Sequence, residues 1–478
     1  MDSLLYNLLR TYMGSLRIKE LSKIGYTNDR ARSLVINTIS KHFKHHTKEE
    51  LITLLTGIKE KPEQYVNDEV LGKIASTFIE KEEVTHHKEF TLLEQTGRLK
   101  IYGGKEIEHA AKKQMEIAMS LPVTVQGALM PDAHTGYGLP IGGVLATDNA
   151  VIPYAVGVDI GCRMSLSIFD EGESFIKRYG YQMKVALKEW THFGMEGGLE
   201  VEQEHPVLDD PAFQATDLLK KLQSKAARQL GSSGSGNHFV EFGMIRLSED
   251  NSLGLPAKEY VALLSHSGSR GLGANIAMHY TKIAMDTCKL PREAQQLAWL
   301  DMNSEAGQEY WLSMQLAGDY AKACHDRIHI NMAKALGLER LITIENHHNF
   351  AWEEILDDGR KVIVHRKGAT PAHKGEPGII PGSMTTAAYL VTGKGVDQSL
   401  FSASHGAGRM MSRKRARESM TVSALKKMLA DAGVTLIGGS VEENPLAYKD
   451  IETVIAAQQE LVTVEGRFLP RIVRMYKE

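Results

Sequence analysis

Six short segments of the sequence place histidine, cysteine or aspartate beside glycine or serine. Glycine lets the backbone approach a ligand closely and offers N–H groups to anions. One such segment carries little information, whereas six in one chain predict a shared pocket. The segments are PDAHTGYGLPIGG (131–143), VGVDIGC (156–162), GSGNHFVE (234–241), SHSGSRG (265–271), ENHHNF (345–350) and SASHGAGR (402–409).

Five residues in these segments are candidate metal ligands. Asp159 and Cys162 lie three residues apart, so that a carboxylate and a thiolate can converge on one turn, and His238, His266 and His348 can complete a site from separate loops. Because a thiolate can bridge two cations, the set is compatible with a dinuclear centre, in which a cation would keep the cysteine ionised. The softness of these ligands alone favours zinc. The alternative is that each histidine is only a hydrogen-bonded loop or core residue.

A further histidine, His405, lies in the stretch S-H-G-A-G-R, which Arg409 closes. A neutral imidazole can attack an activated phosphorus, and a guanidinium group suits a phosphate bidentately. The sequence contains neither a P-loop nor a Lys-x-Asp-Gly stretch of the kind that lysine-adenylating ligases use. The covalent acceptor of a nucleotide therefore need not be lysine. A structural role for His405 is the alternative.

Basic residues gather near these segments. Beside a phosphate pocket they would attract a polynucleotide backbone, whereas on a helix face they would only be solvated. Paired aromatics for base stacking are not evident, so sequence-specific readout is not expected. The basic residues are Arg360, Lys361, Arg366, Lys367, Lys374, Arg409, Arg413, Lys414, Arg415 and Arg417.

The composition is that of an ordinary globular protein, with a formal net charge of -3 over 478 residues. Any RNA site must therefore be a local basic patch. The three cysteines have no paired spacing, which suits a reducing compartment and predicts a cytoplasmic protein. No apolar run approaches the roughly 20 residues that span a bilayer, so no membrane association is expected. Residues 1–17 predict an amphipathic helix rather than a signal peptide.

Two regions are expected. Residues 1–87 predict a helical module, with a capping box at Thr47 and Glu50 and a second helix capped by Asp68. In residues 88–478, short strands such as 151–152 and 260–264 alternate with helices such as 108–120 and 293–316. This alternation of short strands and helices predicts one large α/β (mixed α+β) domain, with its functional residues on loops at the ends of elements.

Residues 88–478 resemble the RtcB family of RNA ligases. The motifs D-x-x-C, G-x-G-N-H-F-x-E, H-S-G-S-R-G, H-N, H-R-K-G-A-T, P-G-S-M and H-G-A-G-R occur in the family's order and are jointly highly specific. The resemblance implies a single large RtcB-like domain whose sheets are flanked by helices. It also implies a GTP- and manganese-dependent enzyme that joins RNA 3′-phosphate or 2′,3′-cyclic phosphate ends to 5′-hydroxyl ends through a guanylated histidine. RNA repair and tRNA splicing are the expected processes.

The resemblance also implies a role for each matching residue. Asp159, Cys162 and His238 would hold one manganese ion, and Cys162, His266 and His348 the second, so that family chemistry replaces the inference of zinc. His405 would carry the guanylate, and Asp132 would assist the opening of the cyclic phosphate. Glu241 would contact the guanine edge. The full nucleotide pocket would comprise Asn237, His238, Glu241, His348, Asn349, Pro381, Gly382, Ser383, Met384, His405, Gly406, Ala407, Gly408 and Lys477.

Five positions depart from the family's usual residues, which suggests a specialised paralogue. They are Arg163 after Cys162, His347 before His348, Thr385 and Ala388 after P-G-S-M, and Pro371 after H-R-K-G-A-T. Arg163 would add a cation beside the metals, and His347 leaves the choice of ligand within its pair open. Two other functions stay open as well: a metal-dependent cyclic phosphoesterase that does not seal RNA, and a non-catalytic protein that binds RNA ends. The sequence also leaves open the natural RNA, any need for an activating protein, and the oligomeric state.

Overall fold

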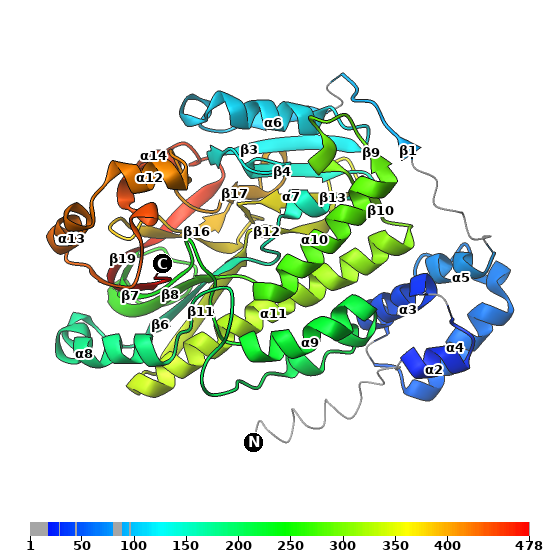
Figure 1. Cartoon of the computed structure of the whole chain (residues 1–478), viewed down its shortest axis with the longest axis horizontal. Coiled ribbons are helices and arrows are strands. Elements are labelled where there is room, and N and C mark those ends of the chain that lie inside the picture. Colours follow the sequence, from blue (N-terminus) through cyan, green and yellow to red (C-terminus); the bar gives the residue numbers. More distant parts are fainter. Residues whose placement is uncertain (1–17, 28, 44, 80–87, 95–96, 478) are drawn as a thin grey trace.

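The computed structural model describes residues 18–477, except residues 28, 44, 80–87 and 95–96. The amphipathic helix expected over residues 1–17 lies outside the described residues. The expected mixed α/β architecture is confirmed: two large sheets with flanking helices form the main body, and a small helical module packs against one side (Figure 1). No helix within the described ranges is both long and apolar enough to cross a membrane.

The larger sheet has eight strands in the order β11-β6-β8-β7-β19-β16-β15, with β18 paired to β19. Successive side chains of a strand point to opposite faces, so the buried strand β8 supplies two cores at once. Val261 and Leu263 enter the core under the helices, while Ala262 and Leu264 enter the core on the other face. The strands are β6 (Arg163–Phe169), β7 (Phe239–Leu247), β8 (Glu259–Ser267), β11 (Arg340–His347), β15 (Pro377–Ile380), β16 (Ala388–Gly393), β18 (Thr435–Ile437) and β19 (Val462–Met475).

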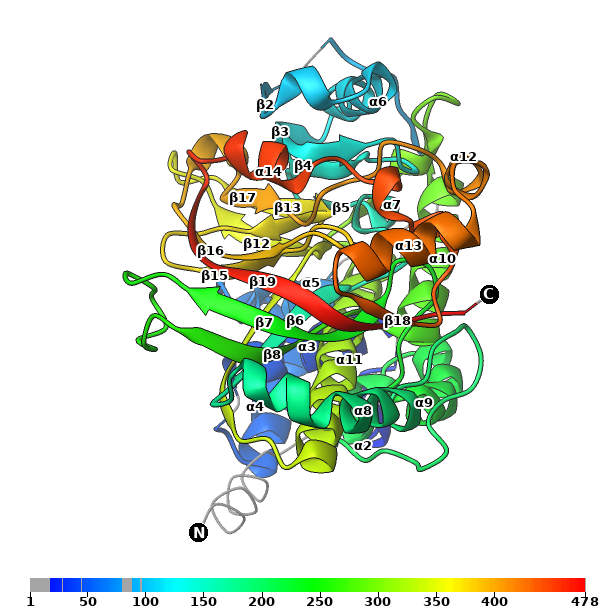
Figure 2. The same cartoon turned by 90° about the vertical axis from the view of Figure 1, so that its left-hand side faces the viewer.

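The second sheet has five strands in the order β12-β13-β4-β3-β2. His348 is the single residue between β11 of the first sheet and β12 of the second, so the chain changes sheet at this histidine. The two sheets lie as successive layers in the side view (Figure 2). The strands are β2 (Arg98–Ile101), β3 (Thr124–His134), β4 (Ile141–Thr147), β12 (Asn349–Ile355) and β13 (Lys361–Lys367). Three two-stranded pairs complete the strands: β14 (Ala369–Pro371) with β17 (Ser402–Ser404), β5 (Ala150–Val151) with β10 (Leu300–Asp301), and β1 (Lys88–Glu89) with β9 (Cys288–Lys289).

Helices cover both sheets. Helices α8 (Glu173–Glu189) and α11 (Glu305–Leu336) pack on the eight-stranded sheet, α10 (Arg270–Thr287) packs on α11, and α9 (Asp217–Gln229) packs on α10 (Figure 1). Helix α6 (His109–Met119) covers β3 of the five-stranded sheet. The remaining helices of this body are α7 (Pro153–Val156), α12 (Arg413–Ser419), α13 (Val422–Asp431) and α14 (Ile451–Ala456).

The helix predicted over residues 293–316 is wrong in its first half. Residues 300–301 instead form β10, and their pairing with β5 is incompatible with a helix at these positions. Helix α11 begins only after Ser304, whose hydroxyl accepts the backbone N–H of Gly307. The helix predicted over 108–120 is confirmed as α6, and the strands predicted at 151–152 and 260–264 correspond to β5 and β8.

The N-terminal module contains α2 (Ile18–Lys23), α3 (Asp29–His42), α4 (Lys48–Glu60) and α5 (Gly72–Ile79) around a core of its own. The capping box is confirmed: Oγ1 of Thr47 accepts the N–H of Glu50, and the Glu50 carboxylate accepts that of Thr47. Asp68 accepts the N–H groups of residues 70 and 71, so it closes the turn before α5 instead of capping that helix. The module packs on α11 through α3, where Asn37 donates to Gln308.

Candidate active site

The ends of four neighbouring strands explain why distant metal-ligand candidates meet. In the order β11, β6, β8 and β7, each strand is antiparallel to its neighbour, so the end of β11, the start of β6, the end of β8 and the start of β7 share one edge. The register places Arg163 opposite both Ser267 and His347, and Phe239 opposite His266. Residues just outside or at these strand ends, namely Cys162, His238, His266 and His348, therefore gather at the same edge.

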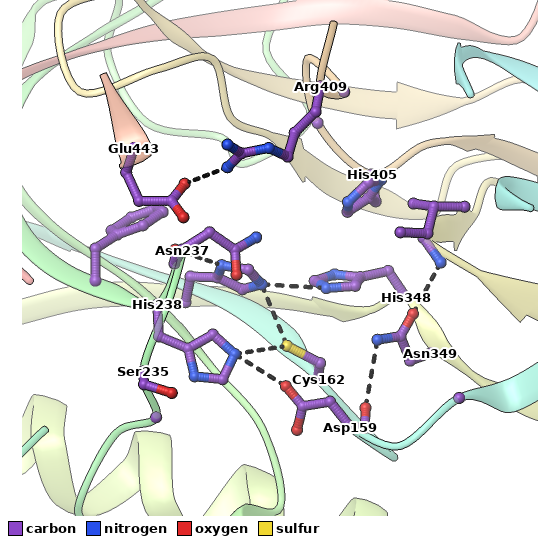
Figure 3. A pocket seen from close by; sticks show the side chains of 18 of the residues that line it. Asp159, Cys162, Ser235, Asn237, His238, His348, Asn349, His405, Arg409 and Glu443 are labelled. Carbon is purple, nitrogen blue, oxygen red and sulfur yellow. Dashed lines mark hydrogen bonds and ion pairs between the residues drawn. The ribbon is translucent and has the colours of Figure 1, made fainter. Parts of the chain in front are cut away.

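The Cys162 sulfur lies at the centre of this group. Its Sγ is 3.4 Å from Nε2 of His238 and 3.2 Å from Nε2 of His266, and Nε2 of His266 is 3.2 Å from Nε2 of His348. Oδ2 of Asp159 lies 2.9 Å from Nε2 of His238. Two triads of donor atoms result, Asp159–Cys162–His238 and Cys162–His266–His348, and within each triad the atoms lie within 4.8 Å of one another (Figure 3). Cys162 belongs to both.

The chemistry of this donor set fits divalent cations. Burial, together with the neighbouring Asp159 carboxylate, raises the pKa of Cys162 well above that of a free thiol. Burial also lowers the pKa of His266 to about 3, so its imidazole keeps a lone pair free at neutral pH. Burial would raise the pKa of Asp159, but the adjacent His238 lowers it to about 2. A buried carboxylate, neutral imidazoles and a thiol that a cation would ionise are together suited to metal binding.

His405 follows β17 and lies beside this group, with its ring centroid 5.0 Å from that of His348. Its Nδ1 is 2.7 Å from Oδ2 of Asp132, a residue of β3 in the five-stranded sheet. The carboxylate therefore orients the imidazole with Nδ1 as the donor, which leaves the Nε2 lone pair free to react. Asp132 is fully buried and does not line the pocket, so its contact with the pocket residues runs through His405.

Two glycines are required by the packing around His405. Gly368 has a φ of +60°, and a Cβ at this position would lie 2.3 Å from Ile141 and 3.1 Å from Cε1 of His405. Gly408 has a φ of +75°, and a Cβ there would lie 1.9 Å from the carbonyl oxygen of Asp132. Any side chain at either position would displace His405 or its carboxylate partner.

All six of the glycine- and histidine-rich segments line a single cavity of about 1380 Å³. Thirteen of the fourteen residues expected in the nucleotide pocket line this cavity: Asn237, His238, Glu241, His348, Asn349, Pro381, Gly382, Ser383, Met384, His405, Gly406, Ala407 and Gly408. Lys477 does not. Its side chain is exposed, two residues past Met475, the last paired residue of β19. Burial raises the pKa of Glu241 to about 8, so this carboxyl is mostly protonated at neutral pH before any ligand binds.

The basic residues expected around the pocket divide into two groups. Lys367, Arg409, Arg413 and Arg415 line it, but Arg409 is already bound by Glu443 at 2.7 Å (Figure 3). The other six do not line it. Among them, Arg366 is fully buried and pairs with Glu354, and Arg360 pairs with Asp358 on the surface.

Arg163, directly after Cys162, does not line the pocket, but its positive charge lowers the pKa of the Cys162 thiol, against the larger effect of burial. Its guanidinium lies 3.2 Å from the carboxylate of Glu345 and donates to the carbonyl of Gly318 at 2.9 Å. It also lies 3.3 Å from Nδ1 of His347, whose ring stacks on Phe350. Within the histidine pair, His348 therefore joins the metal-ligand group and His347 packs behind it.

Several pocket residues were not singled out from the sequence. Glu443 and Tyr448 form part of the wall beside Arg409, in a stretch without any recognisable motif. Arg270 and Tyr137 also line the pocket and lie inside two of the six segments, but the histidines and glycines of these segments were what indicated the site. The unusual φ of +56° at Arg270 is a tertiary feature that composition and spacing do not reveal.

Comparison with known proteins supports a family assignment. The model of the family described as "tRNA-splicing ligase RtcB" matches residues 114–207 and 168–475. The chain is 32% identical over 427 residues to the tRNA-splicing ligase RtcB of Nanoarchaeum equitans, covering 74% of this chain and 89% of the relative. It is 31% identical to the RNA-splicing ligase RtcB of Escherichia coli strain K12, covering 76% and 93%, and 32% identical to that of Mycobacterium tuberculosis, covering 73% and 97%. With its fold, its pocket and these matches, the chain belongs to the RtcB family.

Proposed function

We propose that the protein is a cytoplasmic RNA ligase that joins RNA 3′-phosphate or 2′,3′-cyclic phosphate ends to 5′-hydroxyl ends in RNA repair or tRNA splicing, using GTP and two manganese ions. The observation that carries the proposal is the position of His405, oriented by Asp132 and next to a group of cysteine, histidine and aspartate side chains that could hold metal ions in the same pocket. The names of the relatives, RNA- and tRNA-splicing ligases, support RNA as the substrate.

In the first step, Nε2 of His405 attacks the α-phosphorus of GTP, so that a nitrogen–phosphorus bond forms and pyrophosphate leaves. Asp132 accepts the Nδ1–H of the same ring and stabilises the positive charge that develops on the imidazole. Asp159, Cys162, His238, His266 and His348 would hold the two manganese ions, which when bound would offset the negative charge on the departing pyrophosphate.

In the next steps the guanylate passes from His405 to the RNA 3′-phosphate, which thereby gains a good leaving group. The RNA 5′-hydroxyl then attacks that phosphate and GMP leaves. A cyclic phosphate end is hydrolysed to a 3′-phosphate beforehand. Glu241 offers its carboxylate to the guanine edge, and the Arg413 and Arg415 guanidinium groups on the pocket wall attract the RNA backbone.

Labelled GTP tests this function directly. The full-length protein incubated with manganese and GTP radiolabelled at the α-phosphate should acquire an acid-labile, base-stable label, and His405→Ala should abolish it. His109→Ala is a matched control, because His109 is an exposed residue of α6 whose side chain does not line the pocket. A label that persists in His405→Ala would show that another residue is the nucleophile.

A sealing assay separates the alternatives. RNA that carries a cyclic phosphate end should be joined to a 5′-hydroxyl strand by the wild-type protein with GTP and manganese. If the cyclic phosphate opens without protein labelling or sealing, the protein is a phosphoesterase. If RNA ends bind but neither reaction occurs, it is a non-catalytic end-binding protein.

A further inference from the structure

An exposed tyrosine stands in the wall of the catalytic pocket. Tyr137 lies in the turn between β3 and β4, its side chain is 71% exposed, and it lines the same cavity as His405. Tyr154, Phe239 and Tyr448 line this cavity too, but all three are partly buried. An exposed aromatic ring at a ligand cavity is a surface on which a flat ligand can stack.

The backbone that carries this ring is held from both sides. The N–H of Gly136 donates to Oε1 of Gln114 at 3.0 Å, and Nε2 of the same glutamine donates to the Gly136 carbonyl at 2.6 Å. On the other side of Tyr137, the N–H of Gly138 donates to Oε1 of Gln296 at 2.9 Å. The ring is therefore exposed on a fixed turn, and little conformational entropy would be lost when a ligand stacks on it.

Buried contacts connect this turn to the reactive centre. The ammonium group of Lys367 donates to the backbone carbonyl oxygens of Tyr137 and, at 3.0 Å, of Tyr154. The next residue, Gly368, is the one that abuts the ring of His405. The Tyr154 ring lies edge-on to Tyr137, with 6.5 Å between centroids. The aromatic pair is thus held by a lysine whose neighbour in the chain packs on the nucleophile.

Glu241, the expected guanine contact, comes from a different part of the chain than Tyr137 and from the other large sheet. Glu241 is in β7 of the eight-stranded sheet, whereas Tyr137 follows β3 of the five-stranded sheet. The pocket wall also includes Tyr154, Val158 and Ile141, while Arg409, Arg413 and Arg415 supply guanidinium groups to the same cavity. Single-stranded nucleic acids are bound by this combination of aromatic platforms and basic residues.

We propose that Tyr137 is a stacking platform for an unpaired nucleobase of an RNA end that is bound for ligation, an inference that rests on the proposed function. A stacked base places no demand on hydrogen-bonding pattern, so the site accepts any of the four bases and favours ends that are single-stranded. Tyr137 thereby positions the strand while His405 and the metal ligands carry out the chemistry.

Three variants of the full-length protein test the platform: Tyr137→Ala, Tyr137→Phe and Tyr181→Ala. Tyr181 is the matched control, because it is 75% exposed on α8 and does not line the pocket. Loss of one stack should weaken binding of a fluorescent single-stranded RNA with a 3′-phosphate or a 5′-hydroxyl end by roughly tenfold, measured by anisotropy. Tyr137→Phe and Tyr181→Ala should bind like the wild type. The RNA KM of sealing should rise in Tyr137→Ala while guanylation of the protein from GTP stays unchanged.

An abasic RNA distinguishes stacking from a general effect on the turn. Removing the terminal base of the contacted strand should weaken wild-type binding as much as Tyr137→Ala does, and the two changes together should add nothing further. An effect of Tyr137→Ala that persists fully with abasic ends on both strands would overturn the platform, as would unchanged RNA affinity. A loss of guanylation in Tyr137→Ala would place the ring in the nucleotide site instead. A wild-type protein that is never guanylated would contradict the proposed function. The effect of Tyr137→Ala on RNA affinity is measured without GTP turnover, so it tests the platform separately from guanylation.

Discussion

One carboxylate oxygen, Oδ2 of Asp132, contacts both the ring and the backbone of His405. It lies 2.7 Å from Nδ1 and 3.2 Å from the backbone nitrogen. This double contact fixes both the orientation and the tautomer of the ring. The two residues are far apart in the sequence: Asp132 lies in β3, and His405 follows β17. Which ring nitrogen of His405 stays free is therefore set by a buried side chain that does not line the pocket.

The substitution Asp132→Asn should slow guanylation of the protein while leaving its fold and metal content intact. An amide keeps the size of the side chain but lacks the negative charge that stabilises a positively charged imidazole. A fall of roughly two to four orders of magnitude in the rate of labelling is expected, as for other histidines that depend on a buried aspartate. Rapid-quench labelling with GTP gives the rate. A wild-type rate in this variant would show that the carboxylate only fills space.

The metal content of variants should reveal that both proposed metal sites share Cys162 as a ligand. Since its sulfur belongs to both ligand triads, Cys162→Ala should lose both metal ions, whereas Asp159→Ala should lose only the one held by Asp159, Cys162 and His238. Mass spectrometry of metals in the purified, manganese-loaded protein measures this stoichiometry. His279→Ala, on α10 and outside the pocket, is the matched control for loss of a histidine. Equal losses in the cysteine and aspartate variants would argue against a bridging sulfur.

Guanine recognition should depend on pH through Glu241. Burial raises the pKa of this carboxyl to about 8, and the guanine edge presents N–H donors that need an ionised carboxylate. Below this pKa, binding must release a proton, so the affinity should increase by up to about tenfold per pH unit on going from pH 6 to pH 8 and then level off. Calorimetry with guanosine, which has no phosphate of its own to titrate, measures the affinity. The dependence should disappear in Glu241→Gln; an equal slope in both proteins would place the titrating group elsewhere.

The contact between Arg163 and His347 should contribute to the stability of the fold. Arg163→Ala removes a buried guanidinium that binds the Glu345 carboxylate and the Gly318 carbonyl, and should lower the free energy of unfolding by about 2–3 kcal/mol. Urea unfolding measures the change. Because Arg163 and His347 are in contact, the effects of Arg163→Ala and His347→Ser should be non-additive by about 0.5 kcal/mol or more. Additive effects would mean that the two side chains are independent.

The candidate metal ligands and the candidate nucleophile could be proposed from the sequence because each carries a local signature. Asp159 and Cys162 share one turn, and His238, His266, His348 and His405 are each next to glycine, serine or asparagine. Such residues stand out from their neighbours by type alone. The prediction that their side chains lie together rested only on the general tendency of functional loops to share one edge of a sheet.

Features set by partners distant in sequence could not be predicted in this way. The direction of Arg163 depends on Glu345 in a neighbouring strand, and Arg409 is bound by Glu443, which no motif connects to it. The start of α11 depends on the pairing of β10 with β5, a tertiary contact that overrides the helical character of residues 293–304. The proximity of Tyr137 and Tyr154, seventeen positions apart, likewise arises only from folding.

The division of the centre between two sheets has a consequence for assembly. Asp159, Cys162, His238 and His266 lie at the edge of the eight-stranded sheet, while Asp132 is in the five-stranded sheet, and the chain crosses between them at His348. A folding intermediate with only the larger sheet formed would already gather most of the candidate metal-binding atoms, yet its His405 would not be oriented by Asp132. In the proposed reaction, covalent labelling would therefore report complete maturation of the chain, which cation uptake on its own would not.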